Sequence, residues 1–158
     1  TASQKREVSS VTPPPVHHSF PIFLRGDALR TPFRDAQFDV ITIGYGLRNL
    51  EDLQMGLVEI HRLLRAGGRV LSLDFGKPPN ALWRALYFSY LRWFVPLFGR
   101  MFCGEADAYA YILESLKNYP GQEGLAAAMK QLNFERVRVI NFLGGVMSIN
   151  CGEKAPSG

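Results

Sequence analysis

The chain has 158 residues, a length that allows one domain with a hydrophobic core and is short for two. Its 18 basic and 14 acidic residues give a net charge of +4, but no run of Lys or Arg exceeds two, which argues against nucleic-acid binding and leaves a mild preference for anionic partners. Cys103 and Cys151 form no CxxC pair and have no histidine at metal-ligand spacing, so neither a disulfide framework nor a metal site is predicted.

The first 19 residues predict a flexible leader, or the remnant of an element whose first part lies outside this sequence. TASQKREVSSVTPPPVHHS is polar and contains three consecutive prolines, which are incompatible with helix and sheet. It also lacks the basic, apolar and small-residue succession of a secretory signal. We therefore expect the domain in residues 20–154, followed by a short tail in 155–158.

Two strands are predicted in the first third of the chain. Pro21–Ala28 predicts a short strand that ends at Asp27, and Phe38–Gly44 predicts a second one. The sequence FDVITIG is apolar and β-branched on both faces, which is typical of a central strand covered by helices on each side. The residues GYGLRN follow this strand. Because ligands bind beyond the carboxyl ends of the strands in an open parallel sheet, we expect a ligand crevice there.

An amphipathic helix and a third strand come next. Asn49 is predicted to cap the helix, and the pair Gly67-Gly68 to end it. Arg69–Gly76 predicts the third strand, and the order strand, helix, strand predicts a parallel crossover. One apolar face of the helix is formed at spacings of four, three and four by Leu53, Leu57, Ile60 and Leu64.

The most hydrophobic stretch, Asn80 to Phe102, has about the length of a membrane span. Arg84, Arg92 and Arg100 divide it into short apolar runs, and Pro96 is expected to interrupt any helix. The stretch therefore predicts an interfacial or ligand-covering helix instead of a transmembrane one.

The last third of the chain predicts two helices and a hairpin. The helices are expected over residues 105–118 and within GQEGLAAAMKQLNF, where Leu125, Met129 and Leu132 share one face. ERVRVINF and VMSINCGEK predict an antiparallel hairpin that turns at Gly144-Gly145. The fold class is accordingly α/β, with a mostly parallel sheet and an antiparallel carboxyl-terminal hairpin.

Three segments in order resemble the UbiE/COQ5/MenG family of quinone-biosynthesis C-methyltransferases. They are RGDALRTPFRDAQFDVITIGYGLRN, EIHRLLRAGGRVLSLDFGKP and EADAYAYILESLKNYPGQEGLAAAM, and the resemblance covers roughly Leu24 to Lys154. It implies the class I (Rossmann-like) methyltransferase fold. It also implies methyl transfer from S-adenosylmethionine to the ring of a prenylated quinol.

The resemblance implies roles for particular residues. Asp27 and Ala28 match the pair that lies beside the adenine, and Gly44 matches a position near the sulfonium, where many relatives carry serine. Arg48 is expected to favour a quinol oxyanion, and a guanidinium, which stays protonated, cannot easily act as the base. Positions expected on the substrate side are Tyr45, Asn49, Tyr109 and Tyr111, although core packing is an equal alternative for the last two.

The family's glycine-rich cofactor loop has no counterpart, because residues 1–25 contain no glycine. The chain is therefore expected to be the carboxyl-terminal part of such an enzyme and to be inactive alone. The alternatives are a non-catalytic domain that binds a prenylated ligand or a partner subunit, and a methyltransferase with another acceptor. Peripheral contact with the inner face of a membrane, a cytoplasmic location and association with itself or other biosynthetic subunits are further expectations. The choice between menaquinone and ubiquinone precursors stays open.

Overall fold

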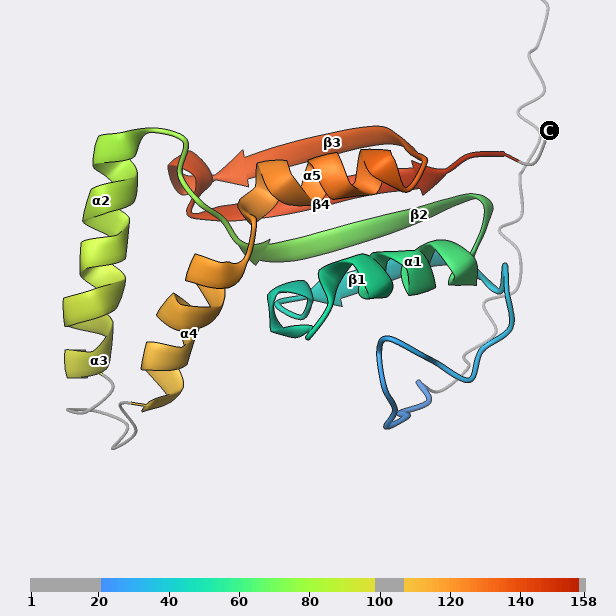
Figure 1. Ribbon diagram of the computed structural model, residues 1–158, viewed down its shortest axis with the longest axis horizontal. Coiled ribbons are helices and arrows are strands. Elements are labelled where there is room, and N and C mark those ends of the chain that lie inside the picture. Colours follow the sequence, from blue (N-terminus) through green and yellow to red (C-terminus); the bar gives the residue numbers. More distant parts are fainter. Residues whose placement is uncertain (1–20, 99–106, 157–158) are drawn as a thin grey trace, which may run out of the picture.

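The computed structural model describes residues 21–98 and 107–156, without the side chains of residues 98 and 107–110. The expected leader therefore lies outside the described residues. Four strands form one sheet in the order β1-β2-β4-β3 (Figure 1). β1 and β2 are parallel, and the other two pairs are antiparallel, so the predicted crossover and hairpin are confirmed. The bounds are Phe38–Gly44 for β1, Leu64–Phe75 for β2, Phe134–Phe142 for β3 and Met147–Lys154 for β4.

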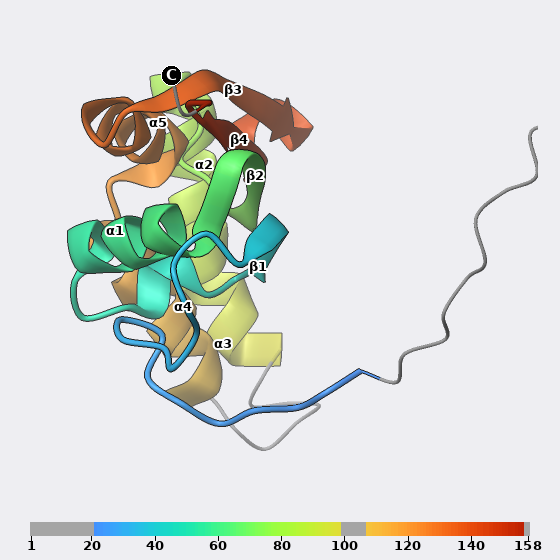
Figure 2. The ribbon, with the colours of Figure 1, turned by 90° about the vertical axis from the view of Figure 1, so that its right-hand side faces the viewer.

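One face of the sheet is covered and the other is not. Figure 2 shows α1 (Leu53–Leu63) and α5 (Gly121–Gln131) together on one face, and no described helix on the opposite face. Each large apolar side chain buried under the helices contributes about 1.5 to 3 kcal/mol. The most deeply buried are Leu57, Leu64, Val70, Leu116, Leu125 and Met129. On the bare face Val40 and Ile140 are about half exposed.

The predicted strand at Pro21–Ala28 is wrong. Residues 21–27 have no regular secondary structure, and the apolar side chains of Ile22, Phe23 and Leu24 are exposed. A strand needs a hydrogen-bonded neighbour, and no described strand lies beside this segment. The chain is instead held to the end of α1 by bonds from the amides of Ala36 and Gln37.

Both predicted ends of the first helix need correction. Asp52 is the N-cap of α1 and accepts from the Met55 amide at 3.0 Å, whereas Asn49 closes the short 3₁₀ turn η1 (Leu47–Asn49). α1 ends at Leu63, before the two glycines. Those glycines lie instead in the irregular start of β2, where the register with β1 shifts and Gly67 has a φ of +73°.

Two helical segments lie beyond the carboxyl ends of β1 and β2 (Figure 1). One is α2 (Ala81–Ser89) continued by the π turn η2 (Tyr90–Phe94) and α3 (Val95–Phe98), and the other is α4 (Asp107–Asn118). The helical path runs through Pro96, contrary to expectation. The π turn ends two residues before Pro96, and the Val95 amide bonds to the Tyr90 carbonyl, so the widened turn precedes the residue that lacks an N–H. Within the described residues, no helix combines the length and the apolar character required to cross a membrane.

Close backbone contacts fix where α2 starts. A Cβ at Gly76, between β2 and α2, would collide with the carbonyl oxygen of Gly145 and lie 2.8 Å from Oε1 of Gln122. The Trp83 indole donates to the carbonyl oxygen of Leu143 at 3.1 Å. The β3–β4 connection thus anchors the first turn of α2.

Candidate active site

A buried ion pair lies where β1 and β2 end. Arg48 Nη1 is 2.5 Å from Asp74 Oδ1, and the two side chains are only 7% and 3% exposed. Arg48 Nε also donates to Ser115 Oγ of α4 at 3.2 Å. The pair therefore joins β2, η1 and α4, in the crevice where the sequence predicted a ligand.

The backbone at Tyr45 directs the loop toward Arg48. Tyr45 has a φ of +55°, which is unfavourable for a residue with a side chain. Its amide donates to the Leu73 carbonyl at 2.8 Å. Its carbonyl accepts from Asn49 Nδ2 at 3.0 Å and lies 3.4 Å from Arg48 Nη1. The positive φ belongs to Tyr45, not to Gly46, whose φ is −101°.

α4 contacts the same loop through a second bond. The Tyr111 hydroxyl donates to Asn49 Oδ1 at 3.1 Å. Hydrogen bonds thus bring together four of the candidate site residues named from the sequence, Arg48, Asn49, Tyr45 and Tyr111. The Tyr109 side chain lies outside the described residues.

Aromatic rings and burial shape the electrostatics of the ion pair. The Arg48 guanidinium lies 5.1 Å from the ring centre of Phe75 and 5.7 Å from that of Tyr45, within the range of cation–π attraction. The pKa of Tyr87 is raised to about 12, chiefly by burial; the Arg48 charge opposes this rise and the Asp74 charge adds to it. Burial also raises the pKa of Tyr119, with the same two charges acting on it. Both phenols therefore stay protonated at neutral pH.

The two oxygens of Asp74 differ in their bonding. Oδ1 accepts from Arg48 and from the Phe75 amide at 2.8 Å. Oδ2 is buried and has no hydrogen-bond partner among the described residues. Arg48 Nη2 likewise makes no hydrogen bond to any described residue. The site therefore keeps one unused acceptor and one unused donor.

Three predicted cofactor positions lie apart from the ion pair. Asp27 and Ala28 are in an exposed turn, where Asp27 Oδ1 accepts from the Leu29 amide at 2.9 Å. Gly44 is the last residue of β1, and nothing lies within 4 Å of a Cβ added to it. Gly44 thus offers the open approach that the sulfonium end of S-adenosylmethionine would need. Gly44 leaves room for that end of the cofactor, while no glycine-rich loop is present among the described residues for its amino-acid end.

Ser115, Tyr119 and Tyr87 were not singled out from the sequence. Ser115 and Tyr119 follow the predicted Tyr111 at spacings of four, which places three hydroxyl-bearing side chains on one face of α4 and its end. This spacing could have indicated Ser115 and Tyr119. Nothing in the sequence separates Tyr87 from the other aromatic residues of its helix.

A protein-family comparison matches residues 19–154 to the ubiE/COQ5 methyltransferase family. The ubiquinone/menaquinone biosynthesis C-methyltransferase UbiE of Azotobacter vinelandii is 42% identical over 132 residues, 84% of this chain and 52% of the relative. A demethylmenaquinone methyltransferase of Alkalihalophilus pseudofirmus is 40% identical over 82% of this chain and 55% of its own length. The chain spans about half the length of the curated relatives it matches.

Solved structures share the fold. A Thermotoga maritima SAM-dependent methyltransferase, titled as a possible histamine N-methyltransferase, has a TM-score of 0.58 at 18% identity and covers 83% of this chain and 63% of its own. Haemonchus contortus phosphoethanolamine N-methyltransferase 2, solved with S-adenosyl-L-methionine, has a TM-score of 0.55 at 12% identity, over 82% of this chain and 36% of its own. The expected class I (Rossmann-like) methyltransferase fold is confirmed.

Proposed function

This chain belongs to the ubiE/COQ5 methyltransferase family, and from that premise we propose that the complete enzyme is an S-adenosylmethionine-dependent C-methyltransferase acting on a prenylated quinol. The relatives named above are ubiquinone/menaquinone and demethylmenaquinone methyltransferases. The proposed acceptor is therefore the demethylated precursor of one of these quinones.

The observation that carries the proposal is the position of Arg48. Its guanidinium is buried at the carboxyl ends of both parallel strands, and it donates to the described residues through Nε and Nη1 but not through Nη2. S-adenosylmethionine, when bound, supplies an electrophilic methyl group. A ring carbon attacks it more readily when negative charge develops on the neighbouring ring oxygen. Although Asp74 offsets the net charge of Arg48, a fixed N–H donor still stabilises that oxygen.

The roles of the remaining predicted residues follow from their contacts. Tyr45 and Asn49 hold the loop that presents Arg48, and Tyr111 binds Asn49 from α4. We assign them to positioning the acceptor side of the site. Gly44 keeps the crevice open for the cofactor, and Asp27 and Ala28 would contact adenine once the missing half of the fold is in place.

The bare face of the sheet and the free edge of β1 offer surfaces on which a further part of the complete enzyme could pack. Among the described strands β1 pairs only with β2, and its outward side chain Val40 is half exposed. We place the part of the enzyme that carries the glycine-rich cofactor loop against these surfaces. The 158-residue chain alone should accordingly show no binding of S-adenosylmethionine by calorimetry at about micromolar affinity, and tight binding would contradict this placement.

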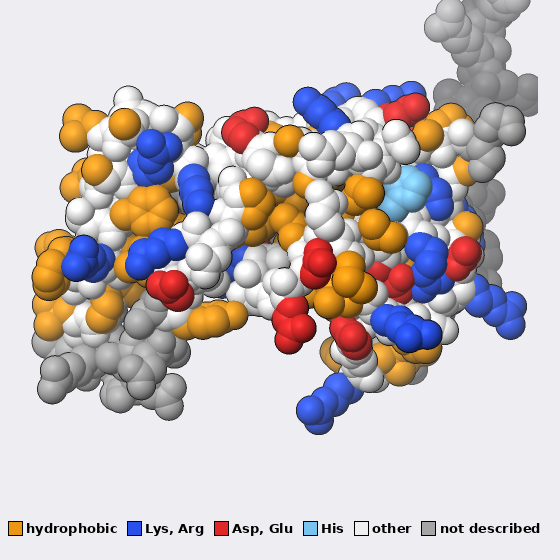
Figure 3. All heavy atoms as spheres, viewed as in Figure 1, with side chains coloured by type: hydrophobic (Ala, Val, Ile, Leu, Met, Phe, Trp, Pro, Cys, Tyr) orange, Lys and Arg blue, Asp and Glu red, His pale blue; other side chains and the backbone are white. Residues whose placement is uncertain are grey.

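The outer side of α2 and α3 provides a surface for peripheral membrane contact. Figure 3 shows hydrophobic side chains gathered over these helices together with basic ones. Trp93 and Leu97 are 66% and 59% exposed, and residues 75–104 contain four cations and no Asp or Glu. An aromatic and basic helix of this kind suits the interface of an anionic bilayer, where a prenylated substrate resides.

Vesicle binding by the complete enzyme tests this surface. Trp93→Glu and Leu97→Glu should reduce co-sedimentation with anionic vesicles, whereas Val58→Glu on α1, also at an exposed apolar position, should not. Trp83 is an unsuitable probe because its indole anchors the β3–β4 connection. Equal binding by all three variants would remove the membrane surface from the proposal.

A labelled-methyl assay tests the proposed reaction itself. The complete enzyme is incubated with S-adenosylmethionine carrying an isotopic methyl group and a short-chain demethylated quinol, and the product is analysed by mass spectrometry. We expect the label on a ring carbon. Cofactor binding without transfer to any quinol would favour the non-catalytic alternative, and transfer to an unrelated acceptor would favour another methyltransferase.

A further inference from the structure

Two buried oxygen atoms close to the active-site cluster lack a hydrogen-bond partner in the described part of the chain. They are Oδ2 of Asp74 and the hydroxyl of Tyr87, on residues that are 2% and 7% exposed. Folded proteins rarely leave such atoms unpaired, because each one destabilises the fold. A third such atom, Ser72 Oγ, lies two residues before Asp74 and farther from the strand end.

The two atoms come from different elements, β2 and α2. Asp74 is next to the last residue of β2, and its Oδ1 is already occupied by Arg48 and the Phe75 amide. Tyr87 lies in α2, and the Asp74 and Arg48 charges both act on its pKa, in addition to burial. Oδ2 can only accept a hydrogen bond while ionised, whereas the phenol can donate and accept. A hydroxyl group is the simplest partner that satisfies both.

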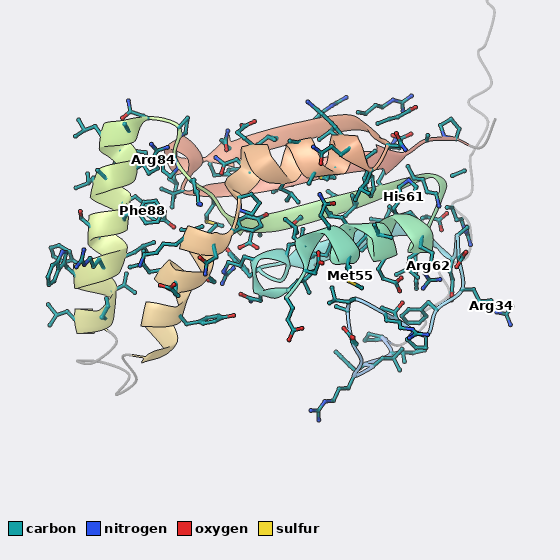
Figure 4. All side chains as sticks on the ribbon, in the orientation of Figure 1. Arg34, Met55, His61, Arg62, Arg84 and Phe88 are labelled. Carbon is teal, nitrogen blue, oxygen red and sulfur yellow. The ribbon has the colours of Figure 1, made fainter. Side chains whose placement is uncertain are left out.

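A groove lined by both apolar and polar side chains begins at Phe88, the residue after Tyr87. The rings of Tyr87 and Phe88 lie 5.7 Å apart, and Figure 4 shows Phe88 on α2. The groove lies between the continuous segment α2–η2 and α4, and two of its lining residues, Arg92 and Lys117, are cations. It is lined by Phe88, Ser89, Arg92, Trp93, Leu113 and Lys117.

We infer that Asp74 Oδ2 and the Tyr87 hydroxyl together bind one hydroxyl of the acceptor ring, and that the groove takes the apolar chain attached to that ring. The inference deepens the proposed function and rests on it, since it names how a quinol is recognised. The ring hydroxyl donates to Asp74, and Tyr87 donates to the same oxygen. The acceptor oxygen is thereby held in the field of Arg48.

Tyr87→Phe is the sharpest variant because it removes one oxygen and keeps the ring. In the complete enzyme, KM for a short-chain quinol should rise about tenfold, the effect of one hydrogen bond. Affinity for S-adenosylmethionine should not change. The melting temperature should not fall, because the hydroxyl has no protein partner to lose. Tyr90→Phe, at an exposed tyrosine near the end of the same helix, is the matched control and should behave as wild type.

A second measurement separates ligand recognition from a structural effect. Binding of the quinol and of its methyl ether is compared by equilibrium dialysis in wild type, Tyr87→Phe and Asp74→Asn. Wild type should bind the free hydroxyl about tenfold more tightly than the ether, and both variants should lose most of that preference.

The outcomes distinguish this inference from the proposed function. If wild type methylates the quinol but Tyr87→Phe keeps its KM and its preference for the free hydroxyl, the inference is wrong and the reaction stands. A lowered melting temperature with unchanged KM would also overturn it, since the hydroxyl would then have a structural partner. If wild type neither methylates nor binds any quinol, the proposed function fails.

Discussion

Two carboxylate–arginine pairs in this molecule have different bonding. Glu59 accepts from Arg62 through both oxygens and from the amide and hydroxyl of Thr31, at 2.7 to 2.8 Å. Arg62 also binds the Phe33 carbonyl and Asp35, at the end of α1 where Figure 4 labels it. Asp74 instead uses one oxygen for Arg48 and leaves the other without a described partner.

The difference separates a structural pair from a functional one. The Glu59–Arg62 pair fastens residues 31–35 to α1, and each carboxylate oxygen of Glu59 has a partner, so it offers nothing to a ligand. The Arg48–Asp74 pair is more deeply buried, with side chains 7% and 3% exposed against 30% and 9% for Arg62 and Glu59, and it remains incomplete. An incomplete buried pair destabilises the free protein, and it is consistent with a site that a bound ligand completes.

The largest expected effect is on turnover at the incomplete pair. Arg48→Ala in the complete enzyme should lower kcat about a hundredfold or more, with nearly unchanged cofactor affinity, because a preorganised charge partner is lost. Arg48→Lys should recover only part of the rate, since a flexible point charge replaces a planar fork. Arg62→Ala is the matched control and should keep kcat. Steady-state kinetics measures kcat, and titration measures the affinity for the cofactor. Normal turnover of Arg48→Ala would mean that Arg48 has only a structural role.

At the Glu59–Arg62 pair, in which both carboxylate oxygens have partners, the expected effect is on stability. Glu59→Gln should lower the free energy of unfolding by about 1 to 3 kcal/mol, because it replaces charge-assisted bonds to Arg62 and Thr31. Chemical denaturation of the wild type and the variant measures the loss. If the variant were as stable as wild type but slow in methyl transfer, the division between the two pairs would be reversed.

The pH dependence of stability sharpens the same contrast. Hydrogen bonds from Arg62, the largest cause, and from Thr31 lower the pKa of Glu59 from 4.5 to about 2. A lowered pKa stabilises the fold above the unfolded value, so this contribution should be complete above pH 4.5 and lost as the pH falls toward 2. Over that range the stability of wild type should fall more steeply than that of Glu59→Gln. Parallel curves would show that Glu59 is not the group responsible.

The smallest effect is expected at Gly44. A Cβ there has no neighbour within 4 Å, so Gly44→Ser should change the free energy of unfolding by less than about 0.5 kcal/mol. The added hydroxyl should strengthen cofactor binding in the complete enzyme by about threefold, the lower range of one hydrogen bond. A clear loss of stability would mean that the crevice is narrower than the structure shows.

Much of the fold follows from local patterns. The strand Phe38–Gly44, the apolar face of α1, the buried residues of α5 and the terminal hairpin agree with the sequence, because periodicity and turn residues determine them locally. Pro21–Ala28 failed because a strand depends on a neighbour that its own sequence does not contain. The cap of α1 moved from Asn49 to Asp52 because the 3₁₀ turn η1 comes first, and both residues are good caps.

Position along the chain indicated only part of the candidate site. Arg48 and Asn49 became candidates because they come directly after β1, and Tyr111 became one through the family resemblance. Ser115 and Tyr87 are brought to Arg48 by α4 and α2, and packing between distant segments cannot be derived from spacing within one of them. The unequal bonding of the Asp74 oxygens is likewise a tertiary property.

The most direct test of the incomplete pair as the acceptor site is a crystal structure of the complete enzyme with S-adenosylhomocysteine and a short-chain demethylated quinol. A ring oxygen should lie within about 3.2 Å of Asp74 Oδ2 or of an Arg48 nitrogen, with the ring beside Gly44. A quinol bound elsewhere, with Asp74 Oδ2 still unpaired or occupied only by water, would contradict it.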